Sequence, residues 1–114
     1  MPVRYSISLP DPAAARGTDP ELAFSANGAE AFAEQLQDAL RSPRLFEAWR
    51  GKQDDPDEVD PALGVTDAAA TVSGEQRDLR INLLATTSIP SEVFKHRMRL
   101  LAGSRWELRD VSAA

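Results

Sequence analysis

The sequence predicts an α+β fold with the element order β-α-β-β-α-β, in which a four-stranded antiparallel sheet carries its helices on one face. Two segments, one near each end of the chain, alternate apolar and polar residues as a half-buried strand does. Two longer segments repeat apolar residues with the period of a helix, and a hairpin pattern lies between them. The length of 114 residues fits one domain that spans 1–114.

The first strand is predicted where Val3, Tyr5 and Ile7 alternate with polar residues, and it ends at Pro10. The following segment, 10–26, is rich in proline and alanine. Because proline and glycine interrupt regular structure, we expect this segment to be a loop.

A helix is predicted at 28–41, with Asn27 as the N-cap of a capping box. Ser42 and Pro43 then interrupt the apolar face, because proline lacks an amide donor and disfavours helical geometry in the residue before it. Serine followed by proline is also a good helix start, so a second helix is predicted at 43–50. The sequence leaves open whether the two helices are continuous.

A second loop is predicted at 51–64, and it holds five carboxylates between residues 54 and 60. A calcium-binding loop of the EF-hand type needs glycine at its sixth position and glutamate at its twelfth. Counted from Asp55, those positions hold Asp60 and Thr66, so the spacing does not fit. We expect a solvated acidic loop, and the sequence leaves open whether it has a role.

A hairpin is predicted from a strand at 68–73, a turn at 74–76 and a second strand at 79–87. In the second strand, Ile81 and Leu83 share one face and alternate with residues expected to point outward.

The last helix is predicted to begin at Pro90 and to end at Gly103. A final strand follows at 105–109, with Trp106 and Leu108 facing inward.

This order of elements predicts the ferredoxin-like arrangement, because right-handed crossovers place the first and third strands in the middle of the sheet. Many unrelated functions occur on that arrangement, so the fold alone predicts no activity.

The composition excludes several chemistries. The chain has no cysteine and one histidine, His96, so disulfides, thiol nucleophiles and multi-histidine metal sites cannot form within it. We expect no bound cofactor or metal. No apolar run approaches the ~18 residues of a membrane-spanning helix, which predicts a cytoplasmic protein without membrane contact. The abundance of alanine, arginine and aspartate is typical of bacteria with GC-rich genomes.

Charge is distributed unevenly along the chain, whose formal net charge is −5. Residues 1–64 carry six basic and twelve acidic side chains, whereas residues 65–114 carry seven basic and six acidic ones. Nucleic-acid binding is not expected, because an acidic chain lacks the electrostatic footprint and no aromatic residue occupies an outward position of the central strands.

One group of residues predicts a binding surface: Arg4, Arg80, Leu84, Arg105 and Arg109. The strand alternation places them on the sheet face that the helices leave open. Arginines around an apolar residue suit a partner that carries carboxylates. The alternative is a solvated face on which the arginines pair with acidic neighbours such as Glu107 and Asp78.

The sequence therefore favours a small non-enzymatic protein-binding domain of the adaptor, chaperone-like or inhibitor type, which docks through the open sheet face or the acidic loop. A small-molecule sensor or enzyme is an alternative, with His96, Arg97, Arg16 and Asn82 as its candidate residues. A self-associating component, such as a homodimer, is a third. The sequence does not identify the partner or the oligomeric state.

Overall fold

The computed structural model describes residues 2–114. Its helices and strands, in chain order, are β1 (Val3–Leu9), α1 (Ala29–Arg41), α2 (Arg44–Arg50), β2 (Thr71–Arg77), β3 (Arg80–Thr87), α3 (Ser91–Ala102) and β4 (Glu107–Ala113). Three short 3₁₀ turns, η1 (Pro12–Ala14), η2 (Pro56–Glu58) and η3 (Pro61–Gly64), lie in the connections.

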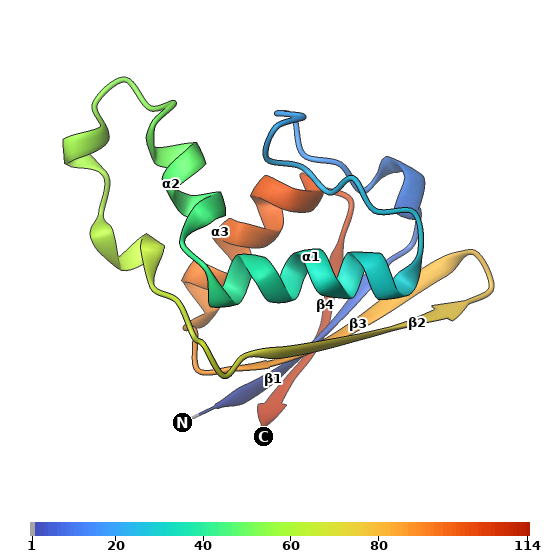
Figure 1. The fold of residues 1–114 in the computed structure, drawn as a ribbon. Coiled ribbons are helices and arrows are strands. Elements are labelled where there is room, and N and C mark those ends of the chain that lie inside the picture. The colour runs from blue at the N-terminus through green and yellow to red at the C-terminus, as the bar shows by residue number, and fades with distance from the viewer. Residues whose placement is uncertain (1) are drawn as a thin grey trace.

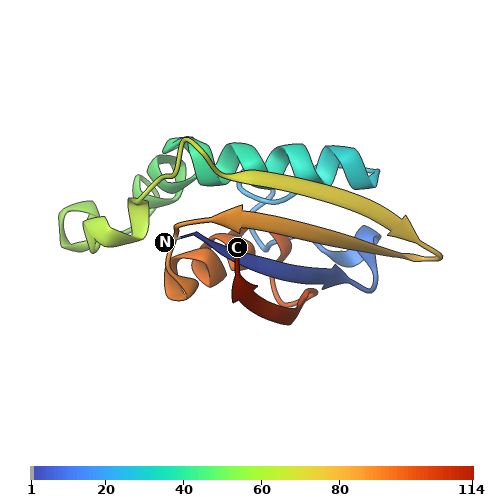
Figure 2. The same cartoon turned by 90° about the horizontal axis from the view of Figure 1, so that it is seen from below.

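The fold is α+β, with one open sheet of four antiparallel strands and three α-helices. The strand order is β2-β3-β1-β4, so β3 and β1 are the inner strands. The helices lie together on one side of the sheet (Figure 1). Seen from below, the strands lie in front of the helices, and this face of the sheet has no helix over it (Figure 2).

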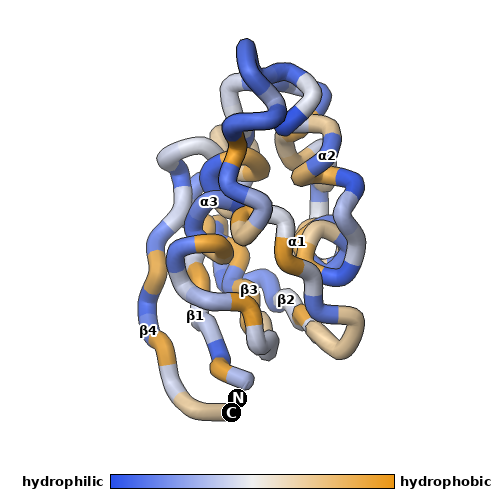
Figure 3. The backbone as a smooth tube through the Cα atoms, turned by 90° about the vertical axis from the view of Figure 1, so that its left-hand side faces the viewer, coloured by the Kyte–Doolittle hydropathy of each residue, from blue (hydrophilic) through white to orange (hydrophobic). Residues whose placement is uncertain are grey.

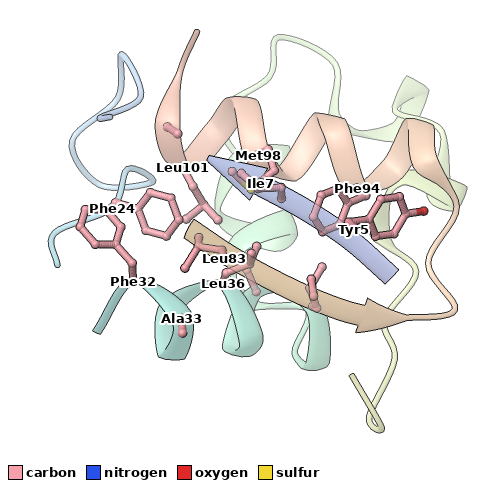
Figure 4. Packing of buried hydrophobic residues seen from close by; sticks show 14 of the residues in the cluster. Tyr5, Ile7, Phe24, Phe32, Ala33, Leu36, Leu83, Phe94, Met98 and Leu101 are labelled. Atoms are coloured by element: carbon pink, nitrogen blue, oxygen red, sulfur yellow. The ribbon is translucent and has the colours of Figure 1, made fainter. Parts of the chain in front are cut away.

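The core lies between the inner strands and the helices (Figure 4). Tyr5 and Ile7 of β1 are buried there with Ile81 and Leu83 of β3, as their alternation predicted. The Tyr5 ring stacks on Phe94 of α3 at a centroid distance of 4.1 Å, and its hydroxyl donates a 2.7 Å hydrogen bond to the carbonyl of Ile89. The buried tyrosine therefore keeps its polar group satisfied, as such residues must.

The chain breaks between α1 and α2 at the predicted place. Ser42 leaves helical geometry with φ −123° and ψ 147°, and its Oγ accepts a hydrogen bond from the amide of Arg44 at 3.1 Å. The serine hydroxyl thus satisfies an amide at the start of α2, while Pro43 has no amide to satisfy. Two separate helices result, rather than one kinked helix.

The capping box predicted for α1 is wrong. The N-cap of α1 is Gly28, not Asn27, and no side chain caps the first turn. Gly28 has φ −132°, an extended conformation that requires no particular residue.

The predicted turn of the hairpin is also wrong. Gly74 lies inside β2, which runs past the expected strand of 68–73, and the chain reverses at Asp78 and Leu79. Asp78 takes a positive φ of 55°, a conformation that aspartate tolerates better than most residues. Gly74 serves helix packing instead, because a Cβ atom there would lie 2.4 Å from the carbonyl oxygen of Ala29 at the start of α1.

The first connection contributes more to the core than a loop was expected to do. Leu22, Phe24 and Ala26 are buried, and the rings of Phe24 and Phe32 meet edge-on at 4.9 Å. The amide of Phe24 donates to the carbonyl of Leu101 at 2.9 Å, which fixes the connection to the end of α3.

The second connection holds the five acidic residues of 54–60, and all five are exposed on the turns around η2 and η3. Figure 3 shows mainly hydrophilic residues along this part of the chain, beyond α2. Among residues 2–114, no helix has the length and apolar character needed to cross a membrane.

Candidate functional site

A concave groove of about 690 Å³ lies on the open face of the sheet. Side chains and backbone from all four strands form it, and its lining comprises Ser6, Ile7, Ser8, Ser73, Gly74, Glu75, Arg80, Asn82, Leu83, Leu84 and Arg109. The face of the sheet that no helix covers is the one toward the viewer in Figure 2.

The strand register explains why these side chains meet. Residues opposite each other on antiparallel strands share a face, and Ser8 of β1 lies opposite Asn82 of β3 and Glu107 of β4. Ser73 of β2 in turn lies opposite Leu84 of β3. Polar residues at alternate positions of four neighbouring strands therefore gather on one surface.

Arg80 is positioned by β1. Its Nη1 donates a hydrogen bond to the Oγ of Ser8 at 3.1 Å. Ser8 belongs to the open face, yet only 1% of its surface is exposed. Arg80 forms no ion pair with any carboxylate of residues 2–114. The alternative pairing with Asp78 is likewise absent within residues 2–114.

Arg109 lines the groove from an irregular part of β4. The register between β1 and β4 shifts between Ser6 and Ile7, so Arg109 is an extra residue between Leu108 and Asp110. Such a bulge re-aims side chains at a sheet edge. The Arg109 guanidinium pairs with Glu107 at 3.1 Å, and both side chains are about half exposed.

Leu84 gives the groove its apolar part. It is 38% exposed at an outward position of an inner strand, where the neighbouring outward positions are polar. A leucine on this face contributes nothing to the core, which lies on the opposite side of the sheet.

The sequence grouped five residues, and the structure brings three of them together: Arg80, Leu84 and Arg109 line the groove. Arg4 lies on the same face, opposite Thr86 of β3 and Ser112 of β4 in the strand register. This position is near the other end of β1, outside the groove lining. Arg105 was expected on the last strand, but β4 begins only at Glu107.

Arg105 instead lies in the turn after α3, where its amide donates to the carbonyl of Ala102 at 3.2 Å. The misplacement has a simple cause. The turn after Gly103 uses two residues more than the polar-apolar alternation indicated, and Trp106 is fixed to that turn by a 3.0 Å hydrogen bond from its indole to the Gly103 carbonyl.

The binding surface predicted from the sequence omitted two polar residues of the groove. Ser73 and Glu75 line the groove from β2, but the misplaced turn had removed Glu75 from any strand. The signal was available in the alternation of Thr71, Ser73, Glu75 and Arg77, four polar residues at every second position. Glu75 pairs with Arg77 at 3.0 Å, so the one carboxylate that lines the groove already has a cationic partner.

The residues considered for a small-molecule site do not converge. Asn82 lies in the groove, whereas Arg16 donates to the carbonyl of Ala26 at 2.6 Å and lies over the Phe32 ring, 5.3 Å from its centroid. His96 and Arg97 lie on α3, on the helix side of the sheet.

Arg97, a candidate residue of the small-molecule alternative, is the largest fully buried side chain of residues 2–114, with 1% exposure. Its guanidinium donates to the backbone carbonyls of Ala39 at 3.2 Å and Leu63 at 3.0 Å, and also to that of Val65. Burial lowers the pKa of Arg97. The group joins α3, the end of α1 and the acidic connection.

His96 is half-buried rather than a free surface residue. Its ring meets the Trp49 ring edge-on at 4.5 Å, and its Nδ1 has no hydrogen-bond partner among residues 2–114. Burial lowers the pKa of His96, and the charges of Arg99 and Arg97 lower it further. General base catalysis requires a partner that orients the imidazole, and within residues 2–114 the Nδ1 of His96 has no such hydrogen bond.

Within residues 2–114 no group of three or more histidine and acidic side chains is arranged to hold a metal ion. Comparisons with protein-family models, with curated proteins and with solved structures found no match to this chain.

Proposed function

We propose that this chain is a small non-enzymatic binding domain that docks a protein partner on the open face of its sheet. One observation carries the proposal: the groove combines an exposed leucine, Leu84, with two arginines, Arg80 and Arg109, on the face that no helix covers. Adaptor, chaperone-like and inhibitor domains work through surfaces of this kind.

The lining of the groove favours binding over catalysis. It contains no histidine, cysteine or lysine, and its one carboxylate is paired outside the lining with Arg77. Arginine and apolar residues are enriched where proteins bind one another, with hydroxyl and amide groups around them. The groove presents that mixture, with Ser6, Ser73 and Asn82 as its neutral polar groups.

The proposal also covers the fold type, the domain extent and the cellular location of the protein. The order of elements, the antiparallel pairing and the position of β1 and β3 support a ferredoxin-like arrangement, with 1–114 as one domain and α2 as an addition to it. We also propose a cytoplasmic location.

The test compares two exposed leucines of the β2–β3 hairpin. The partner is captured from the source organism with the tagged chain, purified, and titrated calorimetrically against variants. Leu84→Asp places an unpaired charge in the groove, and we expect it to weaken binding at least tenfold while the unfolding curve stays close to that of the wild type.

Leu79→Asp is the matched control, because Leu79 is 87% exposed at the hairpin turn and does not line the groove. We expect its affinity to equal that of the wild type. A Leu84→Asp variant that binds with wild-type affinity would contradict docking on this face and would leave the acidic connection or self-association as the mode of action.

A further inference from the structure

The two groove arginines differ in what already holds them. Arg80 has no carboxylate partner within residues 2–114 and is held by the Ser8 hydroxyl at 3.1 Å. Arg109 is occupied by Glu107, also at 3.1 Å. Glu107 and Arg109 are two residues apart on β4, so their side chains are kept near each other by the strand itself.

We propose that the groove receives a carboxylate from an acidic segment of the partner between Arg80 and Arg109, and that Glu107 competes with that carboxylate for Arg109. This inference rests on the proposed function and names the chemistry that the partner brings. The ion pair between Glu107 and Arg109 therefore lowers the affinity for the partner.

The balance of donors and acceptors points to an anionic group. The guanidinium groups of Arg80 and Arg109 and the amide of Asn82 carry donors into the groove, and Ser6 and Ser73 add hydroxyl groups. The only carboxylate in the lining, Glu75, accepts from Arg77. The groove is therefore locally basic in a chain whose net charge is −5.

The geometry favours a carboxylate that lies against a prepared guanidinium. Ser8 is almost completely buried, so its Oγ is a fixed acceptor that orients Arg80 before any ligand arrives. An oriented guanidinium presents its remaining donors as a fork that matches the two oxygens of a carboxylate. Less side-chain entropy is then lost on binding.

When a partner carboxylate replaces Glu107 at Arg109, the guanidinium keeps one carboxylate partner. The side chains of Arg109 and Glu107 are 60% and 49% exposed, and an ion pair so open to water is weak. A partner carboxylate can displace Glu107 at that small cost. Removing the charge of Glu107 should therefore tighten binding by about two- to fivefold.

The experiment uses a hexaglutamate peptide as the probe and ¹H–¹⁵N NMR titration of the full chain, with the side-chain Nε signals of arginine observed directly. We expect saturable shifts at Ser6, Ser8 and Asn82 and at the Nε groups of the two groove arginines. Arg80→Gln and Arg109→Gln should each weaken binding at least fivefold. Arg4→Gln, which removes the same charge from the same face, should change the affinity by less than twofold.

Glu107→Gln should tighten hexaglutamate binding about two- to fivefold, and this gain should vanish when Arg109→Gln is present in the same chain. Glu92→Gln is the matched control, because Glu92 is exposed on α3 and its replacement makes the same change in net charge. Equal gains from Glu92→Gln and Glu107→Gln would overturn the competition. If inorganic phosphate binds as tightly as the peptide, the groove does not select a carboxylate of a polypeptide, and the proposal is overturned.

The outcomes separate this inference from the proposed function. Suppose that Leu84→Asp abolishes binding of the partner, whereas Glu107→Gln and Arg109→Gln leave its affinity unchanged. Docking on the open face would then stand, and the carboxylate site would be overturned. A partner unaffected by Leu84→Asp would overturn both.

Discussion

His96 lies where a positive charge is unfavourable. Its ring is half-buried against the edge of Trp49, and Arg99 and Arg97 follow it closely on α3. Burial and these two charges lower the pKa of His96 below its usual value near 6.5. The unfolded chain therefore binds a proton at a higher pH than the folded chain does.

This difference predicts the direction of a pH effect. Above about pH 6.5 the imidazole is neutral in both states and has no effect. As the pH falls below that value, the unfolded state takes up the proton first, so the free energy of unfolding decreases. Urea unfolding followed by tryptophan fluorescence between pH 7.5 and 5 should show this loss.

The variant His96→Gln separates the effect of His96 on the pH dependence of the free energy of unfolding from the effects of the carboxylates. We expect its free energy of unfolding to fall less than that of the wild type over the same pH range. A wild-type stability that rises on acidification relative to the variant would mean that the folded protein stabilises the imidazolium, contrary to its surroundings.

Single residues also show what periodicity misses. Arg97 lies four residues after Val93 and four before Leu101, so helical spacing places it on the buried side of α3, but that spacing does not show what its charged group binds. Only the folded chain places the carbonyls of Ala39, Leu63 and Val65 around its guanidinium. Those acceptors come from distant parts of the sequence, so no local pattern could indicate them.

At the scale of elements, strand alternation was the most reliable signal. It gave the correct bounds of β1 and the correct inward residues of β3, because a strand with one buried face must repeat with period two. The bulge in β4 limits the same argument, because an extra residue at Arg109 reverses the alternation after it.

The hairpin shows how a glycine can mislead. Gly74 predicted a turn, but the residue lies in β2 where α1 passes over the strand, and Asp78 provides the turn instead. The close approach of the Ala29 carbonyl, at 2.4 Å from an ideal Cβ position, explains the glycine by packing between two elements. Sequence spacing contains no information about that approach.

We expect Gly74→Ala to destabilise the protein by about 1–3 kcal/mol, because the methyl group must displace the backbone at the start of α1. The measurement is urea unfolding of the purified variant. Gly51→Ala is the control, because Gly51 is exposed with a φ of −64° and its ideal Cβ position lies at an ordinary contact distance of 3.5 Å from the carbonyl oxygen of Glu47, so this variant should stay within about 0.5 kcal/mol of the wild type. Equal stability of Gly74→Ala and the wild type would mean that α1 moves away from β2 freely.

At the scale of the whole molecule, both long connections are parts of the structure. The first brings Phe24 into the core and is tied to the second by Lys52, whose Nζ pairs with Asp19 at 2.8 Å and Glu21 at 3.0 Å. The second is held to α3 by Arg97. Composition identified each correctly as lacking long regular elements, but it could not show their contacts.

Arg97 offers a test of how firmly the second connection is fixed. We expect Arg97→Ala to lower the free energy of unfolding by about 3 kcal/mol, because three backbone carbonyls lose a charged donor in a buried site. Limited proteolysis should become faster within 51–65 in particular. Arg99→Ala, an exposed change on the same helix, should stay within about 0.5 kcal/mol of the wild type.

Two results would contradict this role for Arg97. One is a variant as stable as the wild type, and the other is faster proteolysis spread evenly along the chain. If Arg97→Ala does not fold, Arg97→Lys provides the comparison, because a compact ammonium group cannot replace a planar fork that serves carbonyls in three segments.

The sequence by itself determined the order of elements, the faces of β1 and β3, the interruption of the helical pattern at Ser42 and Pro43, and the position of Arg80 and Leu84 on an outward face. Each depends on local geometry, since side-chain period and proline chemistry act within a few residues. The tertiary structure alone decided the groove, the pairing of Arg109 with Glu107 around a bulge, and the burial of Arg97. These features depend on which segments meet across the fold, and that is set by packing among residues far apart in the chain.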